Sequence, residues 1–213
     1  MSARTVVHLM RHGEVHNPDG VLYGRLPGYH LSDLGRQMAQ VVGEHLAAHD
    51  IVRVVASSLE RAQETAGAVA APHELAVATD DRVIEAANWF EGKVFGAGLG
   101  SLARPGAWPR LVNPFRPSWG EPYAEIAARM LPAVADARDA ARGHEVVLVS
   151  HQLPIWTTRC KLEGRRLWHD PRSRQCSLAS LTSLEYADDE LHSITYSEPA
   201  RHLLPGASTV VGA

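Results

Sequence analysis

The chain has 213 residues, 45% of them hydrophobic, which is long enough to bury a large core and typical of a single domain. Its formal charge of −3 favours neither nucleic acid nor an acidic membrane surface as a partner. The two cysteines form no CxxC pair and no apolar run approaches the ~18 residues of a membrane span, so we expect a cytoplasmic protein without an export signal.

The first apolar run, residues 6–10, predicts a buried strand that ends at Arg11-His12-Gly13-Glu14. This places an arginine and an imidazole at the carboxyl edge of a sheet, where open α/β sheets bind their ligands. A histidine after a strand is often only a structural hydrogen-bonding group. An arginine beside it, however, favours an anionic ligand such as phosphate.

Helices and strands then alternate along the chain. Ser32 is expected to cap a helix that runs to about residue 48, because apolar residues recur there at helical spacing. The next expected elements are a strand at 52–56, a helix at 59–71 and a strand at 75–79. Residues 93–120 are rich in Gly and Pro and carry several arginines and aromatic residues. They are interpreted either as a ligand-binding lid or as a packed surface flap.

The second half opens with an amphipathic helix expected at 121–141 and a strand at 146–149, which runs into Ser150-His151. The remaining expected elements are a helix at 152–162 with Pro154 in its first turn, strands at 178–184 and 191–196, and a mobile tail from residue 199.

Three apolar strands therefore each lead into a polar cluster. The first delivers Arg11 and His12, the second Arg61, and the third His151. If the strands are parallel neighbours, these clusters share one edge of the sheet. Two arginines and two histidines at one place would repel one another and destabilise the fold unless they bind an anion.

These segments resemble the histidine phosphatase superfamily, which has the phosphoglycerate mutase-like fold. Residues 11–14 are similar to its first motif, 57–66 to its second and 149–151 to its third, while 31–39 resembles the start of its first helix. The resemblance extends in the correct order from about residue 5 to 151.

The resemblance implies an α/β fold of three layers, α/β/α, with a mostly parallel central sheet. It also implies one histidine phosphatase domain over residues 1–198 that includes the 93–120 insertion, followed by the tail at 199–213.

The chemistry of phosphoryl transfer explains this set of residues. Arg11 and Arg61 would neutralise the phosphoryl oxygens and keep the imidazole of His12 unprotonated. His12 would then attack phosphorus and form a phosphohistidine, while His151 would donate a hydrogen bond to a phosphoryl oxygen. These cations replace a metal, so we expect no metal ligands and no cofactor.

An acid must protonate the leaving group. Residues 81–92 resemble the acid-bearing stretch of the family, which places the acid at Glu85, although the glycine usual after it is absent. Glu91 and Glu14 are the alternatives. The alternative for Glu85 itself is an ordinary surface carboxylate.

Two further residues are candidates for phosphate or substrate contacts. Asn17 lies five residues after His12, where the family often has an asparagine six residues after the nucleophile. Arg25 lies on the loop after the first motif and is either a substrate contact or a solvated arginine.

The resemblance implies hydrolysis of a small phosphorylated metabolite. The segment after Glu85 lacks the Arg-His-Tyr-Gly sequence typical of cofactor-dependent phosphoglycerate mutases, which favours a phosphatase. The alternatives are mutase-type phosphoryl transfer and a non-catalytic module that only binds a phosphorylated ligand. No nucleic acid or membrane is expected as a partner, and a homodimer is left open.

Overall fold

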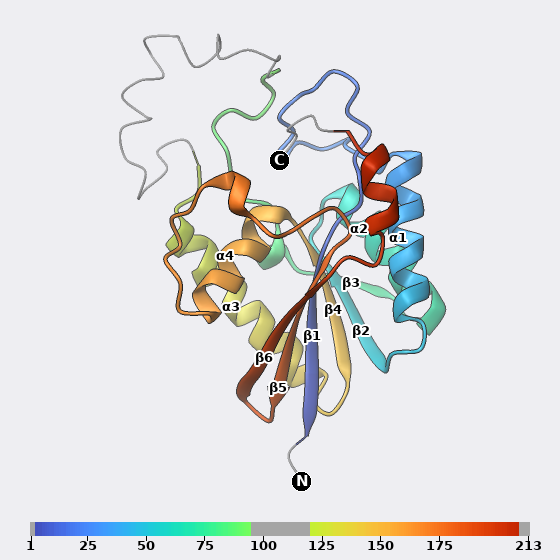
Figure 1. The fold of residues 1–213 in the computed structure, drawn as a ribbon, viewed down its shortest axis with the longest axis vertical. Coiled ribbons are helices and arrows are strands. Elements are labelled where there is room, and N and C mark those ends of the chain that lie inside the picture. Colours follow the sequence, from blue (N-terminus) through green and yellow to red (C-terminus); the bar gives the residue numbers. More distant parts are fainter. Residues whose placement is uncertain (1–2, 95–119, 209–213) are drawn as a thin grey trace.

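A computed structural model describes residues 3–94 and 120–208, and the expected lid lies almost wholly outside them (Figure 1). Its centre is a six-stranded sheet in the order β3-β2-β4-β1-β5-β6. The strands are β1 (Arg4–Arg11), β2 (Ile51–Ala56), β3 (Val77–Thr79), β4 (Glu145–Ser150), β5 (Leu181–Ala187) and β6 (Glu190–Ser197).

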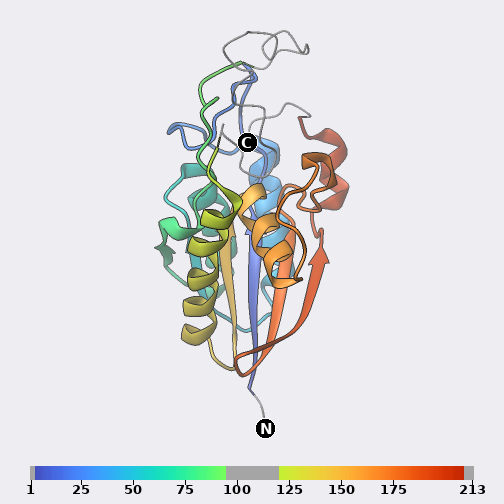
Figure 2. The same cartoon turned by 90° about the vertical axis from the view of Figure 1, so that its left-hand side faces the viewer.

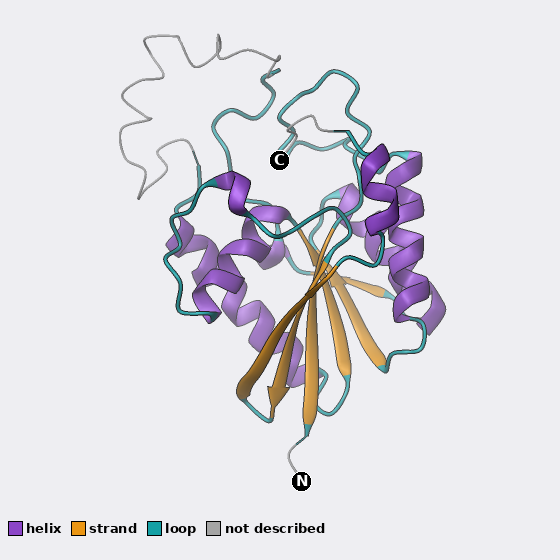
Figure 3. Cartoon of the chain, in the orientation of Figure 1, coloured by secondary structure: helices purple, strands orange, loops and turns teal. Residues whose placement is uncertain are grey.

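The sheet is mostly parallel, as the sequence predicts. β3, β2, β4 and β1 pair in parallel, whereas β5 is antiparallel to both of its neighbours, β1 and β6 (Figure 3). In the register of the central pair, Arg11 lies opposite Ser150. The carboxyl ends of β1 and β4 therefore meet at one edge of the sheet.

Helices cover both faces of the sheet, so the expected three-layer architecture is confirmed (Figure 2). One face carries α1 (Asp33–Leu46) and α2 (Glu60–Ala70), and the other carries α3 (Tyr123–Ala140) and α4 (Gln152–Leu162). Short 3-10 helices complete the described elements: η1 (Ala71–His73), η2 (Asp81–Val83), η5 (Pro171–Ser173) and η6 (Arg201–Gly206).

Alternation along β1 divides the core into two halves. Val7 and Leu9 face the cluster formed with α3 and α4, whereas Met10 faces the cluster formed with α1 and α2. Because both faces are covered, six of the eight residues of β1 are buried, and its apolar residues cluster in one short run instead of alternating with exposed polar ones.

Local signals set the ends of the helices. The Ser32 hydroxyl accepts a hydrogen bond from the backbone N–H of Gly35 at 2.9 Å, which caps α1 at its predicted start. Pro154 lies in the first turn of α4, where the missing N–H removes no intrahelical hydrogen bond.

The segment expected to be a mobile tail contains η6. Leu203 and Leu204 of this helix pack against the core beside α1 and α2, while residues 209–213 lie outside the described part. Within residues 3–94 and 120–208, no helix has the length and apolarity needed to cross a membrane.

Candidate active site

The three predicted polar clusters come together at the carboxyl edge of the sheet. The backbone N–H of His12 donates to the Ser150 carbonyl at 3.2 Å, which joins the segments that follow β1 and β4. The His12 and His151 ring centroids are 5.1 Å apart. Arg61, in the first turn of α2, is close enough to both rings to lower their pKa values.

A close backbone approach holds the segment after His12 in place. A Cβ on Gly13 would lie 2.4 Å from the Gly35 carbonyl oxygen, so only glycine fits there. The Gly13 N–H also donates to the Thr65 hydroxyl at 3.2 Å. The segment is thereby fixed against the first turn of α1 and the middle of α2.

The imidazole of His12 is fully buried, and its protonation follows from its contacts. Nδ1 lies 2.7 Å from the Gly13 carbonyl, which can only accept, so the ring proton resides on Nδ1. Burial, followed by Arg61 and Arg11, holds the pKa of His12 well below its usual value. Nε2 is therefore a neutral nitrogen with a free lone pair.

Both arginines keep donors that nothing in the described part of the chain satisfies. Arg61 is fully buried and donates through Nη2 to the Gly24 carbonyl at 2.6 Å, but its Nε and Nη1 have no partner among the described residues. Arg11 donates to the Cys176 carbonyl at 2.8 Å, and its Nε is likewise unsatisfied within the described chain. Guanidinium N–H donors that are buried and unsatisfied are suited to an anion.

His151 is held from two sides. Its Nε2 lies 2.8 Å from the Ser57 hydroxyl and its Nδ1 lies 3.4 Å from Arg61 Nη2. Burial, together with the charge of Arg61, lowers the pKa of His151 well below the ordinary value, so the ring is neutral. Ser57 was not singled out from the sequence as a site residue, although it directly follows β2, as His12 and His151 directly follow their strands.

Glu85 is a buried carboxyl rather than an ordinary surface group. Its Oε1 accepts the Ala86 N–H at 2.7 Å, while Oε2 is buried without a partner in the described residues. Burial raises the pKa of Glu85, against the opposing effects of the Ala86 N–H and of Arg61, Arg11 and Arg174. Arg174 is a nearby cation that the sequence did not indicate.

The two alternative carboxylates are placed differently. Glu14 accepts hydrogen bonds from the Ser32 hydroxyl and, at 2.6 Å, from the Ser208 N–H, which occupies both of its oxygens. Glu91 accepts the Asn88 N–H at 3.1 Å and is only half-buried. Of the three carboxyls, Glu85 alone is buried with a free oxygen among the site's cations.

Asn17 and Arg25 are both held by hydrogen bonds to other parts of the protein. The side-chain amide of Asn17 exchanges two hydrogen bonds with the backbone of Val21, which closes its own loop. Arg25 donates through Nε to the Glu85 carbonyl at 2.6 Å and pairs with Glu121 at 2.8 Å. Their predicted phosphate or substrate contacts stay predictions.

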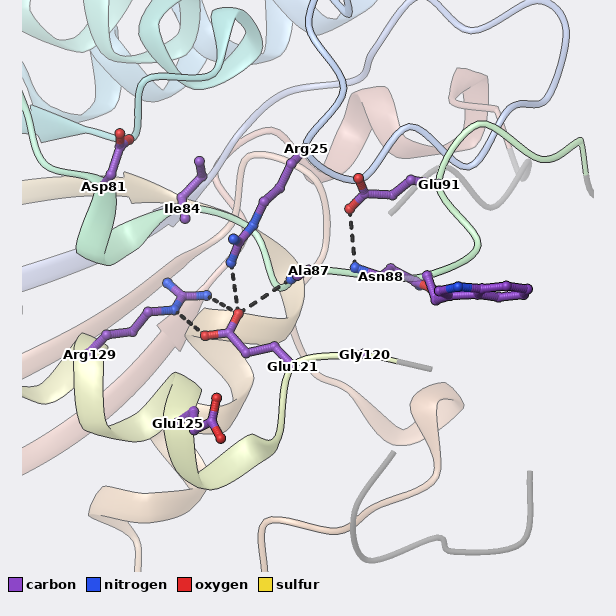
Figure 4. Close-up of a pocket in the computed structure, with 11 residues that line it drawn as sticks. Arg25, Asp81, Ile84, Ala87, Asn88, Glu91, Gly120, Glu121, Glu125 and Arg129 are labelled. Atoms are coloured by element: carbon purple, nitrogen blue, oxygen red, sulfur yellow. Dashed lines mark hydrogen bonds and ion pairs between the residues drawn. The ribbon is translucent and has the colours of Figure 1, made fainter. Parts of the chain in front are cut away.

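Further charged groups gather around Glu121, which also contacts Ala87, two residues after Glu85 (Figure 4). Glu121 accepts from Arg25 at 2.8 Å, from Arg129 at 2.7 Å and from the Ala87 N–H at 3.3 Å. These residues line a pocket of about 860 Å³ that also includes Asn88 and Glu91. Glu121 and Arg129 lie outside the sequence motifs, so the pattern did not indicate them.

Comparisons with known proteins identify the family. A model of the histidine phosphatase superfamily, branch 1, matches residues 7–198. The chain belongs to this superfamily. An uncharacterized protein of Mycobacterium tuberculosis strain H37Rv is 60% identical over 200 residues, which cover 94% of this chain and 99% of the relative.

Two other relatives are named for an activity. A probable phosphoglycerate mutase, GpmB, of Yersinia enterocolitica is 30% identical over 81% of this chain and 82% of its own length. The solved structure of a mycobacterial glucosyl-3-phosphoglycerate phosphatase superposes with a TM-score of 0.73 at 26% identity, over 92% of this chain and 98% of that one. The superfamily thus includes both phosphatases and mutase-like enzymes similar to this chain.

Proposed function

We propose that the protein is a metal-independent phosphomonoesterase that acts on a small phosphorylated metabolite through a phosphohistidine at His12. The observation that carries this proposal is the state of His12 Nε2, a buried and unprotonated nitrogen flanked by guanidinium donors with no partner in the described chain. A nucleophile and spare cationic donors in one buried place suit attack on a phosphoryl group.

In the first step, Nε2 of His12 forms a bond to phosphorus as the bond from phosphorus to the ester oxygen breaks. Arg11 and Arg61 hold the phosphoryl oxygens, and Glu85 gives its proton to the departing alkoxide. In the second step, Glu85 takes a proton from water, which attacks phosphorus and releases inorganic phosphate and free His12.

Binding of the substrate's phosphate group changes the protonation of His151. A dianion beside the ring favours the imidazolium form and raises the pKa of His151 from its low value in the free protein. Nδ1 then carries a proton and can donate a hydrogen bond to a phosphoryl oxygen, while Nε2 keeps its hydrogen bond to the Ser57 hydroxyl. The bond to Ser57 therefore orients the ring.

Phosphoryl transfer of the mutase type is the second candidate, because the relative from Yersinia enterocolitica is named as a probable phosphoglycerate mutase. A mutase must keep water from its phosphohistidine and hold a second charged group of the substrate. Ala86, Ala87 and Asn88, which follow the acid, supply no cation for that purpose. Incubation with a phosphoglycerate separates the two candidates, since a phosphatase releases inorganic phosphate and a mutase forms the isomer.

The test of metal independence is an assay on a panel of phosphomonoesters before and after exhaustive chelation. Because Arg11 and Arg61 supply the positive charge, turnover should be unchanged, within about twofold, in excess chelator at a temperature where the protein stays folded. Loss of activity on chelation, with recovery on adding a divalent ion, would contradict the proposal.

A further inference from the structure

Two histidines and a carboxylate meet at the end of the sheet opposite the active site. His8 lies in β1, Glu145 opens β4, and His49 lies in the turn between α1 and β2. Each offers one ligand atom, and these atoms all lie within 4.8 Å of one another, a grouping found once among residues 3–94 and 120–208. His8 precedes His12 by four residues of extended chain, a separation of about 13 Å.

The two imidazoles converge on one oxygen. His8 Nε2 lies 2.9 Å and His49 Nδ1 lies 2.8 Å from the same atom, Oε2 of Glu145. Hydrogen bonds from His8 and His49, the former the larger effect, lower the pKa of Glu145 to about 2, so the carboxylate is charged. A cation placed among these three ligand atoms would take the position of the two bridging protons.

The surroundings fix the groups without occupying the ligand atoms. His8 Nδ1 lies 2.7 Å from the Ser183 hydroxyl, which can rotate to accept or to donate. Arg4 approaches the other carboxylate oxygen, Oε1, at 3.5 Å, and its main partner is Glu185. His8 is buried, but the side chain of His49 is 37% exposed, which opens the cluster to ions from solvent.

We propose that His8 Nε2, His49 Nδ1 and Glu145 Oε2 form a zinc site that ties β1, β4 and the turn after α1 together. Imidazole nitrogen and carboxylate oxygen are ligands that Zn²⁺ takes in proteins, with water in a fourth position. On binding, the His8 proton moves from Nε2 to Nδ1, where the N–H donates a hydrogen bond to the Ser183 hydroxyl, and the His49 proton moves from Nδ1 to Nε2. Ser183 thus acts as the outer partner that orients a ligating histidine.

The site is independent of the phosphatase chemistry, so its test is zinc binding itself. Untagged protein, stripped with chelator, is titrated with Zn²⁺ in a calorimeter, and its melting temperature is measured with and without the ion. We expect one ion per chain and a higher melting temperature in its presence.

Four variants locate the ion. His49→Ala and Glu145→Gln each remove one ligand and should weaken zinc binding by at least about 100-fold, whereas Ser183→Ala should weaken it by about 10–100-fold. His144→Ala is the matched control, because His144 is an exposed neighbour paired with Asp50 instead, and it should bind zinc as the parent does. Circular dichroism establishes that each variant is folded.

His12→Ala separates this site from the catalytic histidines. Zinc binding that survives in His12→Ala and is lost in His49→Ala supports the proposal. Absence of binding by the parent, unchanged binding in both His49→Ala and Glu145→Gln, or loss of the ion in His12→Ala alone would overturn it. None of these outcomes depends on catalytic activity, so failure here is distinct from failure of the proposed function.

Discussion

The position of one ring proton sets the reactivity of His12. The Gly13 carbonyl holds that proton on Nδ1, and this leaves Nε2 to carry the lone pair. The same burial that lowers the pKa of His12 raises that of Glu85, because in each case burial disfavours the charged form. Both shifts favour the state in which the proposed nucleophile is unprotonated while the proposed acid is protonated.

The pH dependence of kcat/KM tests this pairing. Activity should rise with pH through the lowered pKa of His12, below the ordinary 6.5, and fall as pH passes the raised pKa of Glu85, above the ordinary 4.5. Glu85→Gln should remove the alkaline limb. It should also slow alkyl phosphates by about 10²–10⁴-fold but largely spare aryl phosphates, whose phenols leave without a proton.

Glu91→Gln is the matched control for this prediction, since Glu91 lies on the same loop but is bonded to the Asn88 N–H. The Glu91→Gln variant should keep both the acidic and the alkaline limb of the pH profile of kcat/KM. Equal losses on alkyl and aryl phosphates in Glu85→Gln would instead mark Glu85 as a residue that only positions the substrate.

At the scale of elements, the acid-bearing loop is held to α3 by Glu121. This carboxylate is paired with Arg25 and Arg129 and is only 12% exposed, so its loss leaves two cations with poorly satisfied donors. Glu121→Gln should lower the free energy of unfolding by about 2 kcal/mol, below the ~3–5 kcal/mol of a fully buried pair because Arg25 is partly exposed.

Urea denaturation measures this effect, and Asp136→Ala provides the control. Asp136 also pairs with an arginine, Arg82 at 2.7 Å, but its side chain is 66% exposed, so that variant should lose under about 1 kcal/mol. Similar losses in the two variants would show that the Glu121 network does not support the loop.

A second element-scale prediction concerns the junction between α1 and the segment after β1. A Cβ on Gly35 would lie 2.0 Å from the backbone oxygen of Glu14, whereas a Cβ on Gly67 of α2 meets nothing within 4 Å. Gly35→Ala should therefore destabilise the protein by about 1–3 kcal/mol and reduce turnover by shifting His12.

Gly67→Ala should stabilise the protein by as much as about 1 kcal/mol, since alanine is the better helix former. Thermal melts and a standard phosphatase assay on both variants check the pair. Full stability and activity in Gly35→Ala would contradict the close packing at this junction.

At the scale of the whole molecule, sequence patterns predicted the elements well where physical signals are local. Ser32 marked the start of α1, and mainly apolar runs marked β1, β2 and β4 because these strands are covered on both faces. The parallel arrangement of these strands then brought Arg11, His12, Arg61 and His151 to one edge, as expected.

Features that depend on distant residues could not be predicted in this way. Glu121 meets Arg25 across 96 residues of chain, and His8 meets Glu145 across 137. Separations of this length do not form a recognisable sequence motif. His8 and His49 therefore could not be told apart from the other histidines, which are scattered along the sequence. The interpretation of residues 93–120 as a lid or a flap stays a prediction, because residues 95–119 lie outside the described part of the chain.

The most direct test of the central claim is to trap the covalent intermediate. A substrate labelled with ³²P is mixed with enzyme, quenched in alkali during turnover, and the labelled peptide is identified by mass spectrometry. The account predicts an acid-labile, alkali-stable phosphate on His12, and His12→Ala should form no labelled protein and lose several orders of magnitude in kcat. Phosphate trapped on another residue, or His12→Ala that turns over at a rate near that of the parent, would contradict it.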